Sequence, residues 1–150
     1  MDLYDMNIKG VPFNKEVYVL HIFPCRVGDK FEMKGVNIEV VKAVHPQSEY
    51  PVGYIIEGDG KRIYHAGDTY EFAEMMNYKC DWALLPIGGT YTMDSIGADK
   101  AVREIKPKYA VPIHYSTFEK IMVDAGEFAK MISDTRTKPV VMKFGEKIEI

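Results

Sequence analysis

The sequence predicts an α+β fold, an α/β sandwich in which helices cover a mixed β-sheet. In the first half, short apolar runs alternate with tight glycine turns, a pattern typical of antiparallel hairpins. In the second half, apolar runs alternate with helical patterns, which favours strands with helices packed on a face of the sheet. The chain has 150 residues, 47% hydrophobic and 27% charged, so we expect one globular domain over residues 1–150.

The first half of the chain is expected to form strands. The strand-like runs are Val17–Phe23, which stops at Pro24, then 30–33, 36–44, 52–57 and 62–65. Residues 36–44 alternate apolar and polar side chains, which indicates one buried face. The run Gly58-Asp59-Gly60-Lys61 joins two apolar runs and is a strong hairpin signal.

The second half is expected to alternate helices and strands. Thr69 is a candidate cap for a helix that runs through Met76. Asp94 or Ser95 is a candidate cap for a second helix, which ends before Pro107. A third helix is expected at 124–133. Strands are expected at 81–87, 109–113, 140–143 and 147–150.

Charge and cysteine content argue against several classes of protein. The net charge is −3, so no overall positive field is available for nucleic acid, and we expect no such partner. No apolar run approaches the roughly 20 residues that span a bilayer, and the acidic N-terminus is unlike a signal peptide, so we expect a cytoplasmic location and no membrane partner. Cys25 and Cys80 lie far apart and are expected to be buried reduced thiols.

Several ionisable residues directly follow apolar strands, where sites are commonly built. His45, Asp68 and His114 together offer two imidazoles and a carboxylate, a ligand set suited to Zn²⁺, Fe²⁺ or Mn²⁺. Each histidine alone is more commonly a hydrogen-bonded structural residue, and an Asp such as Asp68 at a glycine turn is commonly a turn residue or helix cap. The other two histidines are interpreted as structural, although His65 is also a candidate to support the site.

Two other classes of site lack their motifs. Gly88-Gly89 is followed by neither Lys-Ser nor Lys-Thr, so a phosphate-binding loop is not indicated, and a tight turn beside a site is the simpler interpretation. No serine stands in a Gly-x-Ser-x-Gly elbow, so a serine hydrolase triad has no support.

Three segments give the chain a close resemblance to the metallo-β-lactamase-fold hydrolases, specifically to uncharacterised metal-dependent hydrolases related to ascorbate-lactone lactonases. They are Tyr64–Thr69 (YHAGDT), Asp81–Met93 (DWALLPIGGTYTM) and Lys106–Tyr115 (KPKYAVPIHY). The motifs place the resemblance from about Val36 to the C-terminus. It implies part of a four-layer αββα sandwich whose two similar halves hold one or two metal ions.

The resemblance also implies roles for individual residues. His45 corresponds to a histidine of the first metal, Asp68 to a carboxylate that bridges both metals, and His114 to the last ligand of the second. Asp68 could also accept a proton, while His65 or Tyr115 could contact a small-molecule substrate. A metal-bound hydroxide would attack an ester, lactone or phosphodiester.

One motif of that family is absent from the sequence. The His-x-His-x-Asp-His element, which supplies most of the other ligands, cannot be formed from the four scattered histidines. The chain therefore resembles the C-terminal part of the fold, and residues 1–24 match no motif of the family. Three functional hypotheses follow. The chain is a hydrolase completed by a separate N-terminal half, or a non-catalytic metal-binding or self-associating domain, or an inert α+β domain with inherited motifs.

Overall fold

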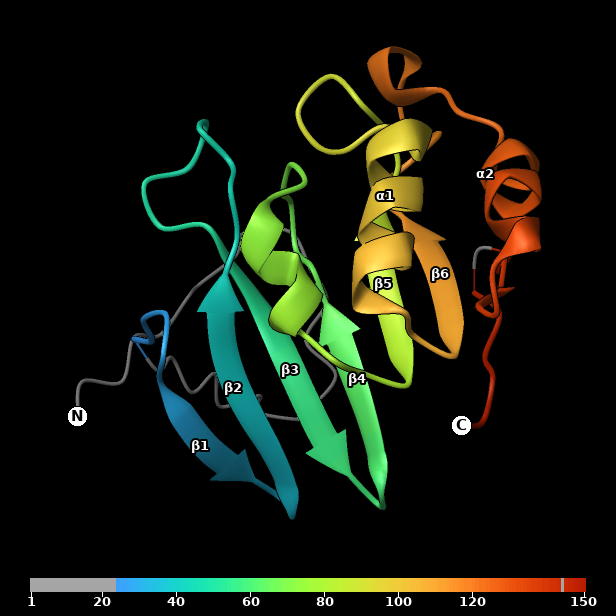
Figure 1. The fold of residues 1–150 in the computed structure, drawn as a ribbon. Helices are drawn as coiled ribbons and strands as arrows, with labels where there is room; N and C mark the ends of the chain where they lie inside the picture. The colour runs from blue at the N-terminus through green and yellow to red at the C-terminus, as the bar shows by residue number, and fades with distance from the viewer. Residues whose placement is uncertain (1–23, 144) are drawn as a thin grey trace, which may run out of the picture.

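The computed structural model describes residues 24–143 and 145–150, and the expected strand Val17–Phe23 and His21 lie outside these residues. A seven-stranded mixed sheet, in which strand order follows chain order, forms the centre of the fold (Figure 1). Its strands are β1 Lys30–Met33, β2 Val36–Lys42, β3 Val52–Gly58, β4 Lys61–His65, β5 Trp82–Pro86, β6 Tyr109–Ile113 and β7 Lys138–Pro139. The predicted mixed sheet is confirmed.

The first four strands are antiparallel and are joined by hairpins. Lys34-Gly35 between β1 and β2 and Asp59-Gly60 between β3 and β4 both have positive φ at the two central residues. This is the conformation of type I′ turns, whose twist matches that of the flanking strands. The predicted hairpin is therefore confirmed, with Gly58 and Lys61 paired as the last residues of the strands.

From β4 onward the strands are parallel, and helices lie in the connections. Helix α1 (Ser95–Ile105) is capped by Asp94, whose Oδ1 accepts a hydrogen bond from the Gly97 N–H at 2.8 Å. Helix α2 (Ala125–Met131) is capped in the same way by Asp124 and continues into the 3-10 turn η3 (Ile132–Asp134). A further 3-10 turn, η2, covers Glu119–Ile121.

Two predicted elements differ from the structure. Thr69 caps no helix, and only a 3-10 turn, η1 (Ala73–Asn77), forms in that region. The Thr69 hydroxyl instead accepts from the Val44 N–H and donates to the Tyr70 carbonyl, so it is used to join two loops.

The predicted strands 140–143 and 147–150 are the second difference. The sheet ends at β7, and the described residues beyond it form no strand. The Val140 N–H donates to the Ala110 carbonyl, after which Lys143 and Glu146 close a turn. The first bond continues the pairing with β6, and the pairing ends before the turn.

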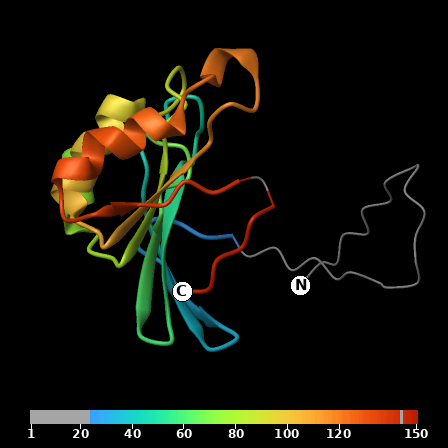
Figure 2. The ribbon, with the colours of Figure 1, turned by 90° about the vertical axis from the view of Figure 1, so that its right-hand side faces the viewer.

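The two faces of the sheet differ in their coverage. Helices α1 and α2 and the turn η1 lie on one face, here called the helix-covered face (Figure 2). Its sheet residues Ile55, Tyr64, Ala83, Leu85 and Ala110 are at most 3% exposed and pack against Met75, Val102, Ile105 and Phe128 in one core cluster.

The opposite face, here called the second face, is also apolar. Strand alternation and register assign to it Phe31, Ile38, Val40, Tyr54, Ile56, Ile63, His65, Trp82, Leu84, Tyr109, Val111 and Ile113. All are half-buried except Val40 and Val111, which are buried. No described helix lies on this face (Figure 2). None of the described helices is long and apolar enough to cross a membrane.

Candidate functional site

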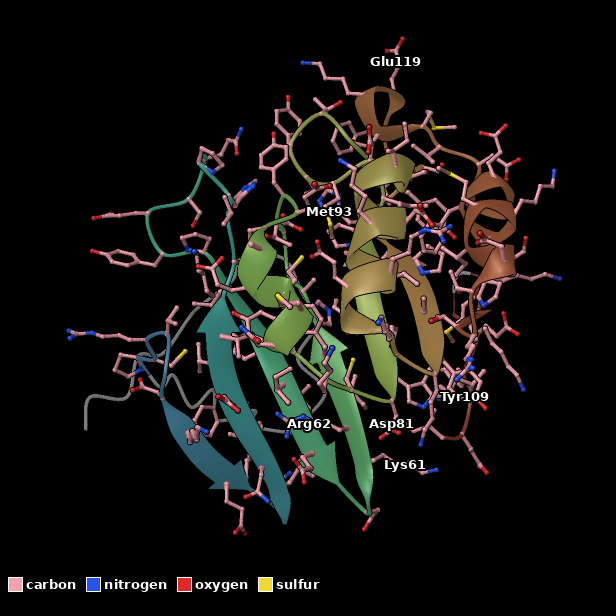
Figure 3. The ribbon with its side chains drawn as sticks, viewed as in Figure 1. Lys61, Arg62, Asp81, Met93, Tyr109 and Glu119 are labelled. Atoms are coloured by element: carbon pink, nitrogen blue, oxygen red, sulfur yellow. The ribbon has the colours of Figure 1, made fainter. Side chains whose placement is uncertain are left out.

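The carboxyl ends of β2, β4, β5 and β6 meet at one edge of the sheet, the upper edge in Figure 1. Loops that contain His45, Asp68, Gly88-Gly89 and His114 follow these four strands. Figure 3 shows Met93 and Glu119 at this end of the molecule, with Lys61, Arg62, Asp81 and Tyr109 at the other. The predicted strand-end residues thus follow the neighbouring strands β4, β5 and β6 and, one strand removed, β2.

Asp68 and His114 form the only close pair among the predicted ligands in the described part of the chain. His114 Nε2 lies 3.5 Å from Asp68 Oδ2, and the two side chains are 32% and 47% exposed. The other ring nitrogen, Nδ1 of His114, is buried and has no hydrogen-bond partner within the described residues. His114 also has φ 53°, a left-handed conformation that is uncommon for non-glycine residues.

His45 is fixed by the loop that follows β5. Its Nδ1 lies 3.0 Å from the carbonyl oxygen of Tyr91, which can only accept, so the ring donates at this atom. The adjacent Val44 binds the Asp68 loop, because its N–H donates to Thr69 Oγ1 at 2.8 Å and its carbonyl accepts from the Tyr70 N–H at 2.8 Å. These bonds hold the His45 and Asp68 loops in register.

His65 ends β4 and lies three residues before Asp68. The Gly67 N–H donates to Nδ1 of His65 at 3.1 Å. Burial lowers the pKa of His65 from its ordinary value, and the nearby Asp68 carboxylate acts in the opposite direction with a smaller effect. Gly67 has φ 66°, and a Cβ there would lie 2.5 Å from the Val52 carbonyl oxygen, so only glycine fits this turn.

The loop after β5 supports the site through its backbone. A Cβ on Gly88 would lie 2.4 Å from the His114 carbonyl oxygen, so the absence of a side chain lets the two strand ends approach. The Met93 N–H donates to the Thr69 carbonyl at 2.9 Å, and Thr90 Oγ1 donates to the Lys120 carbonyl at 2.8 Å. A tight turn beside the site was predicted for Gly88-Gly89, and the structure agrees.

Tyr115 and Ser116 complete the edge. Tyr115 is half-buried and packs against the core cluster. Its suggested contact with substrate stays a prediction. The Ser116 hydroxyl donates to the Val123 carbonyl and accepts from the Val123 N–H, which closes the loop after β6. Sequence reasoning missed Thr90 and Tyr91. Tyr91 contributes its backbone carbonyl to His45, and the Thr90 hydroxyl bonds a distant backbone carbonyl, and no pattern in the sequence indicates either contact.

The described residues supply only part of a metal-binding set. Within residues 24–143 and 145–150, no group of three or more His, Cys, Asp or Glu side chains is close enough to hold an ion. Catalytic zinc sites use three protein ligands, so the Asp68–His114 pair falls short by at least one. The Asp68 carboxylate and His114 Nε2, which lie 3.5 Å apart, are nevertheless donors of the types that such metals bind.

The two cysteines are free, and both are half-buried rather than fully buried as expected. Burial raises the pKa of the Cys80 thiol to about 12, which makes it a poor nucleophile or metal ligand at neutral pH.

Known proteins share this arrangement. Residues 4–115 match the family model described as "Beta-lactamase superfamily domain", so the similarity begins well before Val36, where the motifs alone placed its start. A UPF0173 metal-dependent hydrolase of Sulfolobus acidocaldarius is 39% identical over all of this chain and 74% of its own length. One of Sulfurisphaera tokodaii is 43% identical over 86% of this chain and 60% of its own length.

A solved structure agrees with these sequences. Igni18, described as a novel metallo hydrolase from Ignicoccus hospitalis, has a TM-score of 0.76 and 39% identity over 84% of this chain and 59% of its own. The chain thus spans about three fifths of the length of several relatives that it matches.

Proposed function

The chain belongs to the UPF0173 metal-dependent hydrolase family of the metallo-β-lactamase superfamily, and we propose that it contributes part of a hydrolytic metal centre. The reaction would be attack of water on an ester, lactone or phosphodiester. The remaining metal ligands would come from outside this chain, on an N-terminal half or a partner chain. The observation that carries the proposal is the Asp68–His114 pair, two suitable donors at the edge where four strands end.

In the proposed centre, Asp68 and His114 hold the ion or ions, and His45 joins them from the neighbouring loop. The metal, when bound, would lower the pKa of a water molecule to about 7, so that hydroxide is available at neutral pH. Zinc, manganese or iron(II) suits this mixture of imidazole and carboxylate donors. A carboxylate between two cations would also reduce their repulsion, which is the role proposed for Asp68.

The second face of the sheet supports the need for a partner. Its apolar residues span six strands, and no described helix covers them. Large exposed apolar patches are unusual on monomers and commonly mark interfaces. The relatives that the chain matches contain additional chain, and a segment of that kind could pack on this face.

Reconstitution tests this proposal. The chain is mixed with a polypeptide that corresponds to the unmatched part of the Sulfurisphaera tokodaii relative, and bound zinc, manganese and iron are measured together with ester, lactone and phosphodiester hydrolysis. Lactones are included because the motifs resemble the ascorbate-lactone branch. We expect the mixture to bind metal and hydrolyse at least one substrate class, and Asp68→Asn or His114→Ala to abolish both.

Lys61→Ala provides the matched control, because Lys61 is exposed at the opposite end of β4 (Figure 3). This variant is expected to behave like the wild type. The absence of metal and activity in every combination of metal and substrate would refute the proposal.

A second candidate function is a non-catalytic, self-associating domain. The observation that favours it is the apolar character of the second face, on which Lys61 and Lys138 lie only at strand ends, so two copies could bury a largely apolar surface. Analytical ultracentrifugation of the chain alone distinguishes the candidates. A stable dimer that binds no metal favours the second, and a monomer that assembles only with the added polypeptide favours the first.

A further inference from the structure

Two histidines at the candidate site are held in opposite tautomers. We infer that they have opposite roles: His45 presents an electron pair at Nε2, suited to a cation, while His65 presents an N–H at Nε2, suited to an anionic or carbonyl oxygen of the substrate. This inference rests on the proposed function for its chemistry. The tautomers themselves follow from the hydrogen bonds and can be measured independently.

The hydrogen-bond partner of His45 Nδ1 determines which tautomer the ring adopts. The Tyr91 carbonyl, 3.0 Å from Nδ1, has no hydrogen to donate, so Nδ1 must carry the proton. A neutral imidazole has one N–H, and Nε2 of His45 is therefore left with a free electron pair. Tyr91 is itself fixed, because its N–H and that of Thr92 both bind the Gly89 carbonyl. A carbonyl that orients a histidine in this way is the usual support of a metal-binding imidazole.

His65 has the opposite kind of hydrogen-bond partner. The group 3.1 Å from its Nδ1 is the backbone N–H of Gly67, which can only donate, so Nδ1 must be unprotonated. The single hydrogen of the neutral ring then lies on Nε2. The turn that supplies this N–H requires glycine, because Gly67 has φ 66° and a Cβ there would lie 2.5 Å from the Val52 carbonyl oxygen.

The surroundings of His65 preserve this state. The ring is half-buried, and burial lowers its pKa, so the neutral form with one N–H predominates at neutral pH. A neutral imidazole N–H is an effective donor to an oxygen that gains negative charge during hydrolysis. Binding a metal through Nε2 would instead place a proton on Nδ1 against the Gly67 N–H.

The first test is the tautomeric state of the chain labelled with ¹⁵N-histidine, read at neutral pH from long-range ¹H–¹⁵N correlations and assigned with single His→Gln variants. We expect the proton of His45 on Nδ1 and that of His65 on Nε2. The opposite tautomer at either residue overturns the inference. Because neither metal nor partner is present, this result is separate from the success or failure of the proposed hydrolase.

The second test concerns the donor role of His65 and uses inorganic phosphate as the probe. We expect phosphate to shift the ¹⁵Nε2 resonance of His65 more than that of His45. His65→Ala should weaken phosphate binding by about fivefold, the usual value of one hydrogen bond, and His65→Gln, which keeps an N–H, should weaken it less. An unshifted His65 resonance, or equal binding by the alanine variant, would show that His65 is not a donor to such an oxygen.

Discussion

Leu84 and Leu85 are neighbours in β5, yet they lie in different environments. Leu85 points to the helix-covered face and is fully buried, whereas Leu84 points to the second face and is half-buried. The same contrast separates Tyr64 from Ile63 in β4. Within β5 the two faces are chemically alike, because both carry apolar side chains, and only their coverage differs.

The apolar composition of the second face is unusual for a sheet face that no helix covers. A sheet with one solvated face normally alternates apolar and polar residues, whereas sheets that are covered on both sides have continuous apolar strands. Strand β5, with the sequence WALLP, is of the continuous kind. The second face therefore has the composition of an interior, and we expect substitutions on it to cost less stability in the chain alone than substitutions on the helix-covered face, and more in any assembly.

The largest difference between the faces is expected when a charged side chain is introduced on each face of β5. Leu85→Asp places a carboxylate in the core cluster, and we expect a loss of more than about 4 kcal/mol in the free energy of unfolding, enough to unfold a typical domain. Leu84→Asp should leave the chain folded and reduce its association with any partner. Circular dichroism and urea unfolding measure the first effect and sedimentation the second. Equal destabilisation by both would show that the faces do not differ.

A smaller pair of substitutions removes aromatic rings. Phe128 of α2 is fully buried on the helix-covered face, and Phe128→Ala should cost about 3–5 kcal/mol. Trp82 stacks on Tyr109 on the second face with ring centroids 4.1 Å apart, but it is half-buried, and Trp82→Ala should cost about 1–2 kcal/mol. Denaturant titrations of both variants measure the difference, and a larger cost for Trp82→Ala would contradict the comparison.

The helices that cover the first face are joined by Arg103. Its guanidinium bonds Asp99 within α1 and, across to the end of α2, Asp134 and the Met131 carbonyl. Arg103 holds the pKa of Asp134 below its usual range. Because the folded pKa is depressed, this pair stabilises the fold above the unfolded pKa of about 3.9 and the stability is lost as the pH falls through the folded value.

We expect Arg103→Met to return the pKa of Asp134 to its ordinary range and to move acid unfolding to slightly higher pH. An NMR titration of Asp134 and an acid-unfolding curve measure these shifts. Lys61→Ala, which removes a charge far from α1, serves as the control. An unchanged pKa of Asp134 in Arg103→Met would contradict the assigned contact.

The smallest effect is on reactivity rather than stability. Cys80 packs against the core cluster, and burial raises the pKa of its thiol to about 12. In a Cys25→Ser background, alkylation by iodoacetamide should be slow at pH 8 and should rise about tenfold per pH unit well beyond pH 9, since only the thiolate reacts. A plateau near pH 9 would indicate an ordinary exposed thiol.

Much of the fold could be predicted from the sequence, because its signals are local. The glycine turn at Asp59-Gly60, the cap at Asp94 and the apolar run of β5 each act within a few residues. Thr69 was misread because its hydroxyl has two uses: it resembles a helix cap, but it binds Val44, a partner distant in sequence.

The candidate site was less predictable because its contacts join residues that are distant in sequence. Strand ends indicated His45, Asp68 and His114, but the sequence could not reveal that Asp68 and His114 approach each other or that Tyr91 orients His45. Such backbone contacts have no residue preference. The missing ligands lie beyond any inference from the described residues, and reconstitution is the direct way to find them.

The order of strands in the sheet has a consequence for how the chain folds. The first four strands are closed by short loops, and hairpins of this kind form in about 1–10 μs. The parallel strands are joined by longer connections, which are residues 66–81, 87–108 and 114–137. The contacts between these strands are therefore more distant in sequence and slower to form. An arrested folding intermediate would therefore expose the unpaired edge of β4, and aggregation during expression should begin there.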